Sequence, residues 1–241
     1  MSLLRYATLG GDKFRDEYSL SFDGTDEYIA VSNNSSIQFD NDALTISVWI
    51  KAGALENDWN RILGKGDLSS GTQSYELMQI NTDGILRFQL EDASSSRAET
   101  STTLVNNIWY HIVCTYDKIK TKIYVNGALD GESSYTADVG INTENLYIGT
   151  GASLGNCFEG KVSDLSMYNC ALSASQIKTI YNGREPYNHK EGIASSNLVG
   201  WWRMGDGLEN HSGSTIYDMS TNSNNGTMTN MASDDFTGDT P

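Results

Sequence analysis

Two aspartates in one short turn are the clearest candidates for metal chemistry in this sequence. Asp23 and Asp26 are separated only by Gly24 and Thr25, so two carboxylates lie within four residues of flexible backbone. Calcium takes about six to eight oxygen ligands, and a turn of this kind can supply several of them. An Asp-Gly pair is also a favourable turn in its own right. A structural calcium site and a plain turn therefore stand as alternatives.

A tryptophan in a strongly polar stretch is the best candidate for contact with a sugar. Residues 56–60 read ENDWN, which places Trp59 between Asp58 and Asn60. An exposed aromatic ring has an apolar face that can stack on a pyranose, while polar neighbours bond its hydroxyls. The alternative is a ring that folds back over a sheet edge. We name Trp59, Asp58 and Asn60 as candidate ligand-binding residues.

The histidines and serines form no recognisable catalytic pattern. His111, His189 and His211 are widely separated, and none belongs to an H-x-x-x-H or H-E-x-x-H motif. The serines include no G-x-S-x-G sequence, which marks the nucleophile of many hydrolases. Zinc chemistry and a Ser-His-Asp site therefore have little support.

The elements that must position these residues are short strands. Apolar residues alternate with polar ones, as at Leu44, Ile46, Val48 and Ile50, which places them on one face of a strand. Asn126-Gly127 lies between two such runs and is typical of a two-residue hairpin turn. The predicted strands cover residues 18–22, 28–31, 44–50, 75–80, 85–90, 109–116, 121–125, 128–132, 146–149 and 162–168.

One short helix is predicted after the last of these strands. Ser173 and Gln176 form a capping-box pattern, and Ile177, Ile180 and Tyr181 share one face. Gly183 can end the helix in the left-handed conformation. So many short strands with a single helix predict an all-β sandwich or barrel, and a sandwich can reach 241 residues as one domain.

Charge and cysteine content limit the partners. The 31 acidic and 16 basic side chains give a net charge of −15, which disfavours nucleic acid and anionic membranes. No run of about 18 apolar residues predicts a membrane span, and no standard signal peptide begins the chain. Cys114, Cys157 and Cys170 are an odd number with no CxxC pair, so we interpret them as free thiols.

Four segments, in this order, resemble the laminin G-like domains that have the concanavalin A-like jelly-roll fold. Residues 20–28 (LSFDGTDEY) and 44–50 (LTISVWI) resemble the opening strands, residues 109–127 the central hairpin, and residues 158–183 the closing strand and its helix. The resemblance implies an all-β, two-sheet antiparallel jelly-roll sandwich. It also implies a structural calcium whose ligands are Asp23, Asp26 and Asp164, and a structural role for His111.

The same fold carries glucanases, so the resemblance also raises an enzyme hypothesis. Retaining chemistry needs two carboxylates about 5 Å apart. In those enzymes they follow the pattern E-x-D-x-x-E on one strand. The closest fragment here is Glu56-Asn57-Asp58, which lies in a polar loop and has Arg61 where the closing Glu is needed. We therefore predict no enzymatic activity and no catalytic residues.

The C-terminal segment is unusual for its position. Residues 198–204 (LVGWWRM) and the Asn/Gly-rich turn that follows resemble segments found beside laminin G-like units in bacteriophage and marine-virus structural proteins. We expect residues 198–231 to complete the domain as strands rather than to be left from a repeat. The predicted organisation is an N-terminal arm (1–17), one jelly roll (18–231) and a flexible tail (232–241).

These observations predict a non-enzymatic module for binding, display or adhesion. The expected setting is the virion surface, as a capsid decoration or fibre protein that contacts glycans or other proteins, including viral capsid or tail proteins. The alternatives are a carbohydrate-binding module of a secreted, extracellular bacterial enzyme, or a concanavalin A-like glycoside hydrolase or lyase. Membrane insertion is not expected.

Overall fold

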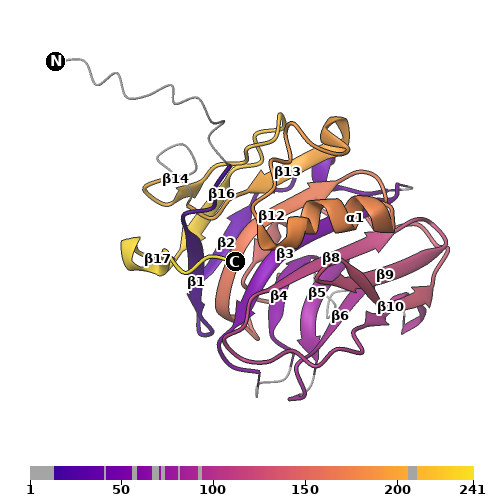
Figure 1. Ribbon diagram of the computed structural model, residues 1–241, viewed down its shortest axis with the longest axis horizontal. Coiled ribbons are helices and arrows are strands. Elements are labelled where there is room, and N and C mark those ends of the chain that lie inside the picture. Colours follow the sequence, from indigo (N-terminus) through magenta and orange to yellow (C-terminus); the bar gives the residue numbers. More distant parts are fainter. Residues whose placement is uncertain are drawn as a thin grey trace.

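The protein is a sandwich of two antiparallel sheets, which confirms the predicted fold class. The computed structural model describes residues 14–40, 42–55, 59–66, 71, 74–80, 82–91, 94–205 and 211–241. Figure 1 shows the sheets stacked face to face, with α1 (Ala174–Tyr181) lying across the outer side of the nearer one. No helix in the described part of the chain is long and apolar enough to cross a membrane.

The first sheet lies beneath α1 in Figure 1. Its strands run in the order β10 (Ala128–Ser134), β9 (Lys120–Val125), β8 (Tyr110–Tyr116), β3 (Leu44–Ala52), β12 (Glu159–Tyr168), β1 (Ser19–Asp23) and β17 (Phe236–Thr237), and β13 (Leu198–Trp202) also pairs with β12. The middle of this sheet is built from strands that are distant in sequence, so its register depends on long-range pairing.

The second sheet forms the other layer. Its strands run in the order β14 (His211–Ser212), β15 (Thr215–Ile216), β16 (Gly226–Thr229), β2 (Tyr28–Val31), β11 (Leu146–Ile148), β4 (Arg61–Lys65), β5 (Tyr75–Ile80), β6 (Ile85–Leu90) and β7 (Ala98–Glu99). Short 3-10 helices lie in the connections, at Ser35–Ile37, Ser94–Ser96, Asn182–Arg184, Ser195–Asn197 and Ser233–Asp235.

Alternation along the strands produces the core between the sheets. Leu44, Ile46, Val48 and Ile50 are fully buried there, as their spacing predicted. All ten predicted strands are present, with ends displaced by at most three residues. Asn126 and Gly127 have φ values of 50° and 78°, so both turn residues take the left-handed conformation that this hairpin requires.

A smaller apolar cluster lies on the outer side of the first sheet, under α1. Ser173 and Gln176 form the predicted capping box. Ile177 and Ile180 pack on Val113, Tyr168 and Trp201, among others. The left-handed C-cap is Asn182, and Gly183 after it is also left-handed at φ 65°, so two residues make the turn predicted at Gly183 alone.

Some strands gave no usable signal in the sequence. β4 contains only Ile62 and Leu63 as apolar residues between Arg61 and Gly64, so no alternation of useful length exists. Pairing on both sides, with β11 and β5, makes it a strand. The very short strands β7, β14, β15 and β17 likewise exist because neighbouring strands supply partners.

The C-terminal region lies on both sheets. β13 pairs with β12 and β16 pairs with β2, which is the strand pairing expected for residues 198–231. The tail differs from the sequence prediction of a flexible segment at 232–241. β17 pairs with β1, and the Asp239 carboxylate bonds Lys51 and Lys161 of the first sheet. Backbone pairing and ion pairs therefore hold this tail.

Candidate functional site

The structure does not bring the three predicted calcium ligands together. Asp23 ends β1 and Asp26 lies in the turn after it. Both are exposed, and the Asp23 carboxylate accepts a hydrogen bond from the Thr25 amide at 2.7 Å. Asp164 is buried on β12. Among the described residues, no group of three His, Cys, Asp or Glu side chains is arranged to hold a metal ion. The set does not fit one ion, and a calcium site in the turn stays a prediction.

Asp164 instead lies at a β-bulge under the apolar cluster. Its φ of 48° is left-handed, and the pairing of β12 with β3 shifts register between Ser163 and Ser166. Oδ1 accepts a hydrogen bond from Trp201 Nε1, and Oδ2 lies 3.2 Å from His189 Nε2. Burial would raise the pKa of Asp164, but His189 and Trp201 outweigh it and lower that pKa. Both oxygens therefore have protein partners.

A second buried histidine lies in the same region without forming a triad. Ser47 Oγ and His111 Nε2 are 2.8 Å apart. His111 Nδ1 is buried and has no hydrogen-bond partner among the described atoms, whereas the Asp164 carboxylate bonds His189 and Trp201. Burial lowers the pKa of His111 to about 3. This agrees with the structural role expected for His111.

The predicted sugar-binding residues have three different outcomes. Trp59 is 45% exposed, and its ring lies beside Arg87 of β6, so the ring is open to solvent on the outer side of the second sheet. The Asn60 side chain is buried, and the Asn60 carbonyl accepts a hydrogen bond from the Gln79 amide at 2.8 Å, which removes Asn60 from the surface. Asp58 lies outside the described residues. Trp59 is thus the described member available to a ligand.

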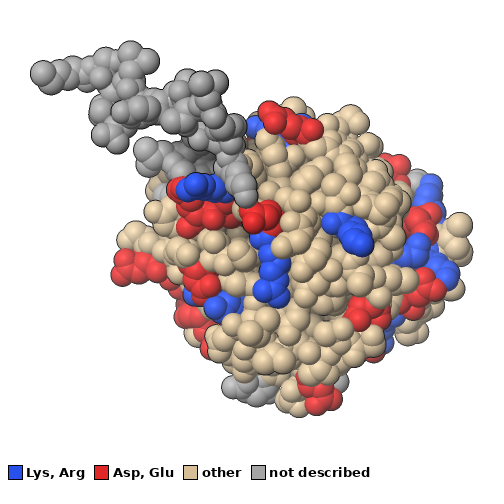
Figure 2. All heavy atoms as spheres, viewed as in Figure 1, with Lys and Arg blue, Asp and Glu red and all other residues tan. Residues whose placement is uncertain are grey.

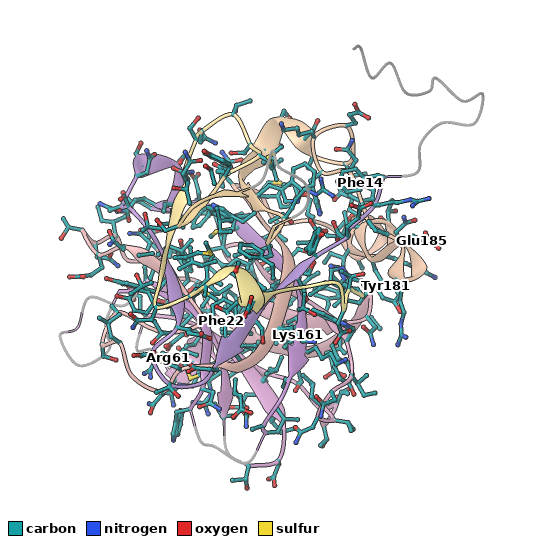
Figure 3. All side chains as sticks on the ribbon, turned by 90° about the vertical axis from the view of Figure 1, so that its left-hand side faces the viewer. Phe14, Phe22, Arg61, Lys161, Tyr181 and Glu185 are labelled. Atoms are coloured by element: carbon teal, nitrogen blue, oxygen red, sulfur yellow. The ribbon has the colours of Figure 1, made fainter. Side chains whose placement is uncertain are left out.

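Polar side chains next to Trp59 cover the outer face of the second sheet. The Arg87 guanidinium lies 5.3 Å from the centre of the Trp59 ring, and Arg87 also bonds Glu99 at 2.6 Å. We call the following set the Trp59 face: Trp59, Arg61, Glu76, Arg87, Gln89, Arg97 and Glu99. Figure 3 shows Arg61 on the side of the sandwich opposite Tyr181.

The inner members of the Trp59 face are bonded in a row across β4, β5 and β6. Arg61 Nε bonds Glu76, Gln89 donates to Glu76 at 3.3 Å, and Arg97 donates to Gln89 at 3.2 Å. Tyr75 and Leu77 point into the core, so Glu76 between them faces outward. The alternation of β5 and β6 could have predicted this facing, but the order of β4, β5 and β6 was needed to assemble the row.

Ion pairs between glutamates and arginines determine which kind of ligand the Trp59 face suits. Glu76 and Glu99 each have an arginine partner, so their charges are neutralised within the protein. Glu76 and Gln89 are almost fully buried, whereas Trp59 is exposed and the Glu99 side chain is 43% exposed. An apolar ring surface beside fixed polar groups suits stacking and hydrogen bonding to a neutral sugar.

Comparisons with known proteins agree with this architecture. A family model described as Concanavalin A-like lectin/glucanases superfamily (Laminin_G_3) matches residues 23–178. A comparison with curated protein sequences gave no significant match. A candidate carbohydrate-binding protein of Bacteroides ovatus ATCC 8483 superposes with a TM-score of 0.68 and 23% identity, over 91% of this chain. This chain spans 60% of the length of that protein.

Two further solved structures share the fold at lower similarity. The SAP-like pentraxin of Limulus polyphemus has a TM-score of 0.52 and 18% identity, covering 69% of this chain and 82% of its own. Domain 4 of AbnA, an extracellular GH43 arabinanase of Geobacillus stearothermophilus, was solved with arabinotriose. It has a TM-score of 0.51 and 18% identity, covering 68% of this chain and 76% of its own. At sequence identities this low, the structural similarity shows a shared fold alone.

Proposed function

The chain belongs to the Laminin_G_3 family of the concanavalin A-like lectin/glucanases superfamily, and we propose that it is a carbohydrate-binding module that acts without catalysis. Fold alone does not confer activity, so the proposal rests on the Trp59 face. Two structural relatives agree with this class: one is a candidate carbohydrate-binding protein, and the other was solved with arabinotriose.

The exposed Trp59 ring is the observation that carries the proposal. Its backbone has a left-handed φ of 67°, an uncommon conformation for a large side chain. Arg87 lies against the ring and is itself held by Glu99, so the ring is supported by fixed neighbours. A supported ring loses little freedom when a ligand stacks on it, which favours binding.

The pairing of the acidic side chains favours binding over hydrolysis. Retaining hydrolysis needs two carboxyl groups that face the glycosidic bond. The two carboxylates described on the Trp59 face are instead paired with arginines, Glu76 with Arg61 and Glu99 with Arg87. Their charges are therefore balanced within the protein.

Substitution of the ring tests the proposal. We expect Trp59→Ala to weaken binding of neutral oligosaccharides, arabinotriose included, by about tenfold or more, which is about 1.4 kcal/mol. Isothermal titration calorimetry on the full chain measures this. Tyr18→Ala is the matched control, because Tyr18 is another aromatic residue with a similar exposure of 40%. Equal affinities for the two variants would contradict the assignment to Trp59.

A hydrolysis assay tests the second half of the proposal. Incubation with the same oligosaccharides should release no shorter products. Turnover that disappears in Glu76→Gln or Glu99→Gln would instead establish the glycoside hydrolase alternative, because these are the carboxylates described on this face.

The biological setting that we propose is the surface of a virus particle, with glycans or other proteins as partners. This proposal rests on the resemblance of residues 198–231 to segments of viral structural proteins. Mass spectrometry of purified particles should find the chain among the structural proteins. Detection only as part of a secreted bacterial enzyme would support the extracellular alternative.

A further inference from the structure

A row of hydrogen-bond donors crosses the outer face of the first sheet, beyond the area that α1 covers. Lys161 on β12 is the direct cross-strand partner of Lys51 on β3. The neighbouring Ile50 pairs with Tyr110, which places Trp109 next to Lys51. Ile50 and Val162 point into the core, so both lysines point outward. Two ammonium groups and one indole N–H therefore gather at one place.

Like charges opposite each other in a sheet are destabilising unless an anion lies between them. Asp239 supplies that anion from the C-terminal tail. Its Oδ2 accepts hydrogen bonds from Lys161 Nζ at 2.6 Å and Lys51 Nζ at 2.8 Å. Its Oδ1 accepts a third from Trp109 Nε1 at 3.0 Å. Three donors, from β3, from β12 and from the residue just before β8, thus meet one carboxylate.

The place is open to solvent rather than part of the core. The Asp239 side chain is 34% exposed, and the Lys51 and Lys161 side chains are 19% and 26% exposed. A cleft of about 290 Å³ adjoins them, and both lysines line it together with Ser21, Asn107 and two acidic residues, Asp23 and Glu159. Figure 3 shows the C-terminal trace passing Lys161 on the α1 side of the sandwich. A ligand could approach the same donors through this cleft.

The segment that carries Asp239 is attached through one short strand and through Phe236, which packs against the core. β17 pairs with β1 through only two residue pairs, Ser19 with Thr237 and Leu20 with Phe236. Ser19 Oγ adds one bond to the Asp239 carbonyl at 2.7 Å. No residue from 232 to 241 is buried. The Asp239 carboxylate is therefore held mainly by the donors themselves.

We propose that Lys51, Lys161 and Trp109 form a carboxylate-binding site, which Asp239 occupies and from which a carboxylate on a ligand displaces it. The ligand class is a carboxylate, presented either by an acidic sugar or by a peptide. The site lies on the first sheet and the Trp59 face on the second, so the two proposals stand or fall separately. Surface charges of both signs are interspersed on the α1 side in Figure 2, so the attraction is local to this row.

The test removes the Asp239 carboxylate from the site by substitution in the full chain. We expect Asp239→Ala to bind D-glucuronate at least tenfold more tightly than the unsubstituted protein does, by isothermal titration calorimetry. D-glucose, which lacks the carboxylate, should bind neither protein at this site. Adding Lys161→Met to Asp239→Ala should abolish the gain. The peptide FTGDTP, which is residues 236–241, is the second probe and is titrated into the same proteins. Comparison of the two probes distinguishes a carboxylate on a peptide from a carboxylate on a sugar.

Asp234→Ala is the matched control. Asp234 is exposed on the same tail, and its removal changes the net charge equally. A gain in Asp234→Ala equal to that in Asp239→Ala, or a gain that survives Lys161→Met, would overturn the proposal. So would the failure of both probes to bind Asp239→Ala. Binding of the peptide alone would support the site and assign it to peptides. If Asp239→Ala does not fold, Asp239→Asn takes its place.

Discussion

Asp164 joins three parts of the chain that are far apart in sequence. Trp201 on β13 and His189 in the preceding connection both bond its carboxylate, while Tyr168 OH lies 2.5 Å from His189 Nδ1. Aspartate is among the few residues that tolerate the left-handed conformation that the bulge requires. The residue therefore fixes β12, the connection and β13 relative to one another, a role that leaves its oxygens unavailable to calcium.

The lowered pKa of His111 predicts how the free energy of unfolding depends on pH. The folded state keeps the pKa of His111 at about 3, against an ordinary value of 6.5, because the ring is buried. Between these values the unfolded chain binds a proton that the folded chain does not. The free energy of unfolding should therefore fall as the pH is lowered, by up to about 1.4 kcal/mol per pH unit. Urea unfolding at pH 7 and pH 5 measures the fall.

His111→Gln is the variant that isolates this effect, because it removes the titrating ring. Its free energy of unfolding should change less between pH 7 and pH 5 than that of the unsubstituted protein. Equal changes in the two proteins would show that His111 does not contribute. Asp239 acts in the same direction below the ordinary pKa of a carboxyl, since Lys161, Lys51 and Trp109 lower its pKa despite partial burial.

The calcium hypothesis is now confined to Asp23 and Asp26, and it makes a separate prediction. An ion that binds only the folded state stabilises it by mass action, so EDTA should lower the melting temperature. Asp23→Ala should remove the difference between calcium-loaded and chelated samples, whereas Asp164→Asn should keep it. An unchanged melting temperature on chelation of the unsubstituted protein would refute the hypothesis.

At the scale of elements, β12 changes its partner along its length. Its first half pairs with β1, from Leu20 with Val162 to Asp23 with Glu159, and its second half pairs with β13, from Leu165 with Trp202 onward. The bulge at Asp164 lies between the two halves. β13 therefore pairs with the same edge of β12 as β1 does, beyond the point where β1 ends. This makes β13 part of the domain rather than an addition to it.

Removal of the C-terminal segment should therefore unfold the protein. A chain that ends at Gly183 loses Trp201, Trp202 and Met204, which are all buried. Each buried large side chain contributes about 1.5–3 kcal/mol, and the total stability of a domain is only about 5–15 kcal/mol. Circular dichroism should show no cooperative melting. A chain that ends at Met231 keeps these residues and should fold, with a lower melting temperature because β17 and Asp239 are lost.

One result of the truncation would contradict the proposed role of the C-terminal segment in stability. If the chain that ends at Gly183 is soluble and melts cooperatively at the temperature of the full chain, the segment is an appendage. Trp201 and Trp202 would then contribute nothing to the core in which the structure places them.

At the scale of the whole molecule, the sandwich separates two surfaces by the thickness of its core. The Trp59 face lies outside the second sheet, and the donor row of Lys51, Lys161 and Trp109 lies outside the first. α1 covers another part of the outer surface of the first sheet through Ile177 and Ile180. The fold therefore presents an exposed aromatic ring among paired charges on one side, and two lysines that hold Asp239 on the other.

Local patterns in the sequence determined the fold class and most of its strands. Alternation at Leu44–Ile50, the Asn126-Gly127 turn and the capping box at Ser173 depend only on neighbouring residues, and each agrees with the structure. The polarity of its neighbours left the exposure of Trp59 open, and the structure shows that the residue is 45% exposed. Free thiols at Cys114, Cys157 and Cys170 also agree with the structure.

Tertiary structure alone decided which distant residues meet. Three sets of contacts join segments that no local pattern links. They are the bonds of Asp164 to His189 and Trp201, the row of Arg61, Glu76 and Gln89, and the contact of Asp239 with both lysines. β4 and β17 are strands because partners lie beside them. The physical reason is that sheet hydrogen bonds and ion pairs form between strands whose order is set by the packing of the whole core.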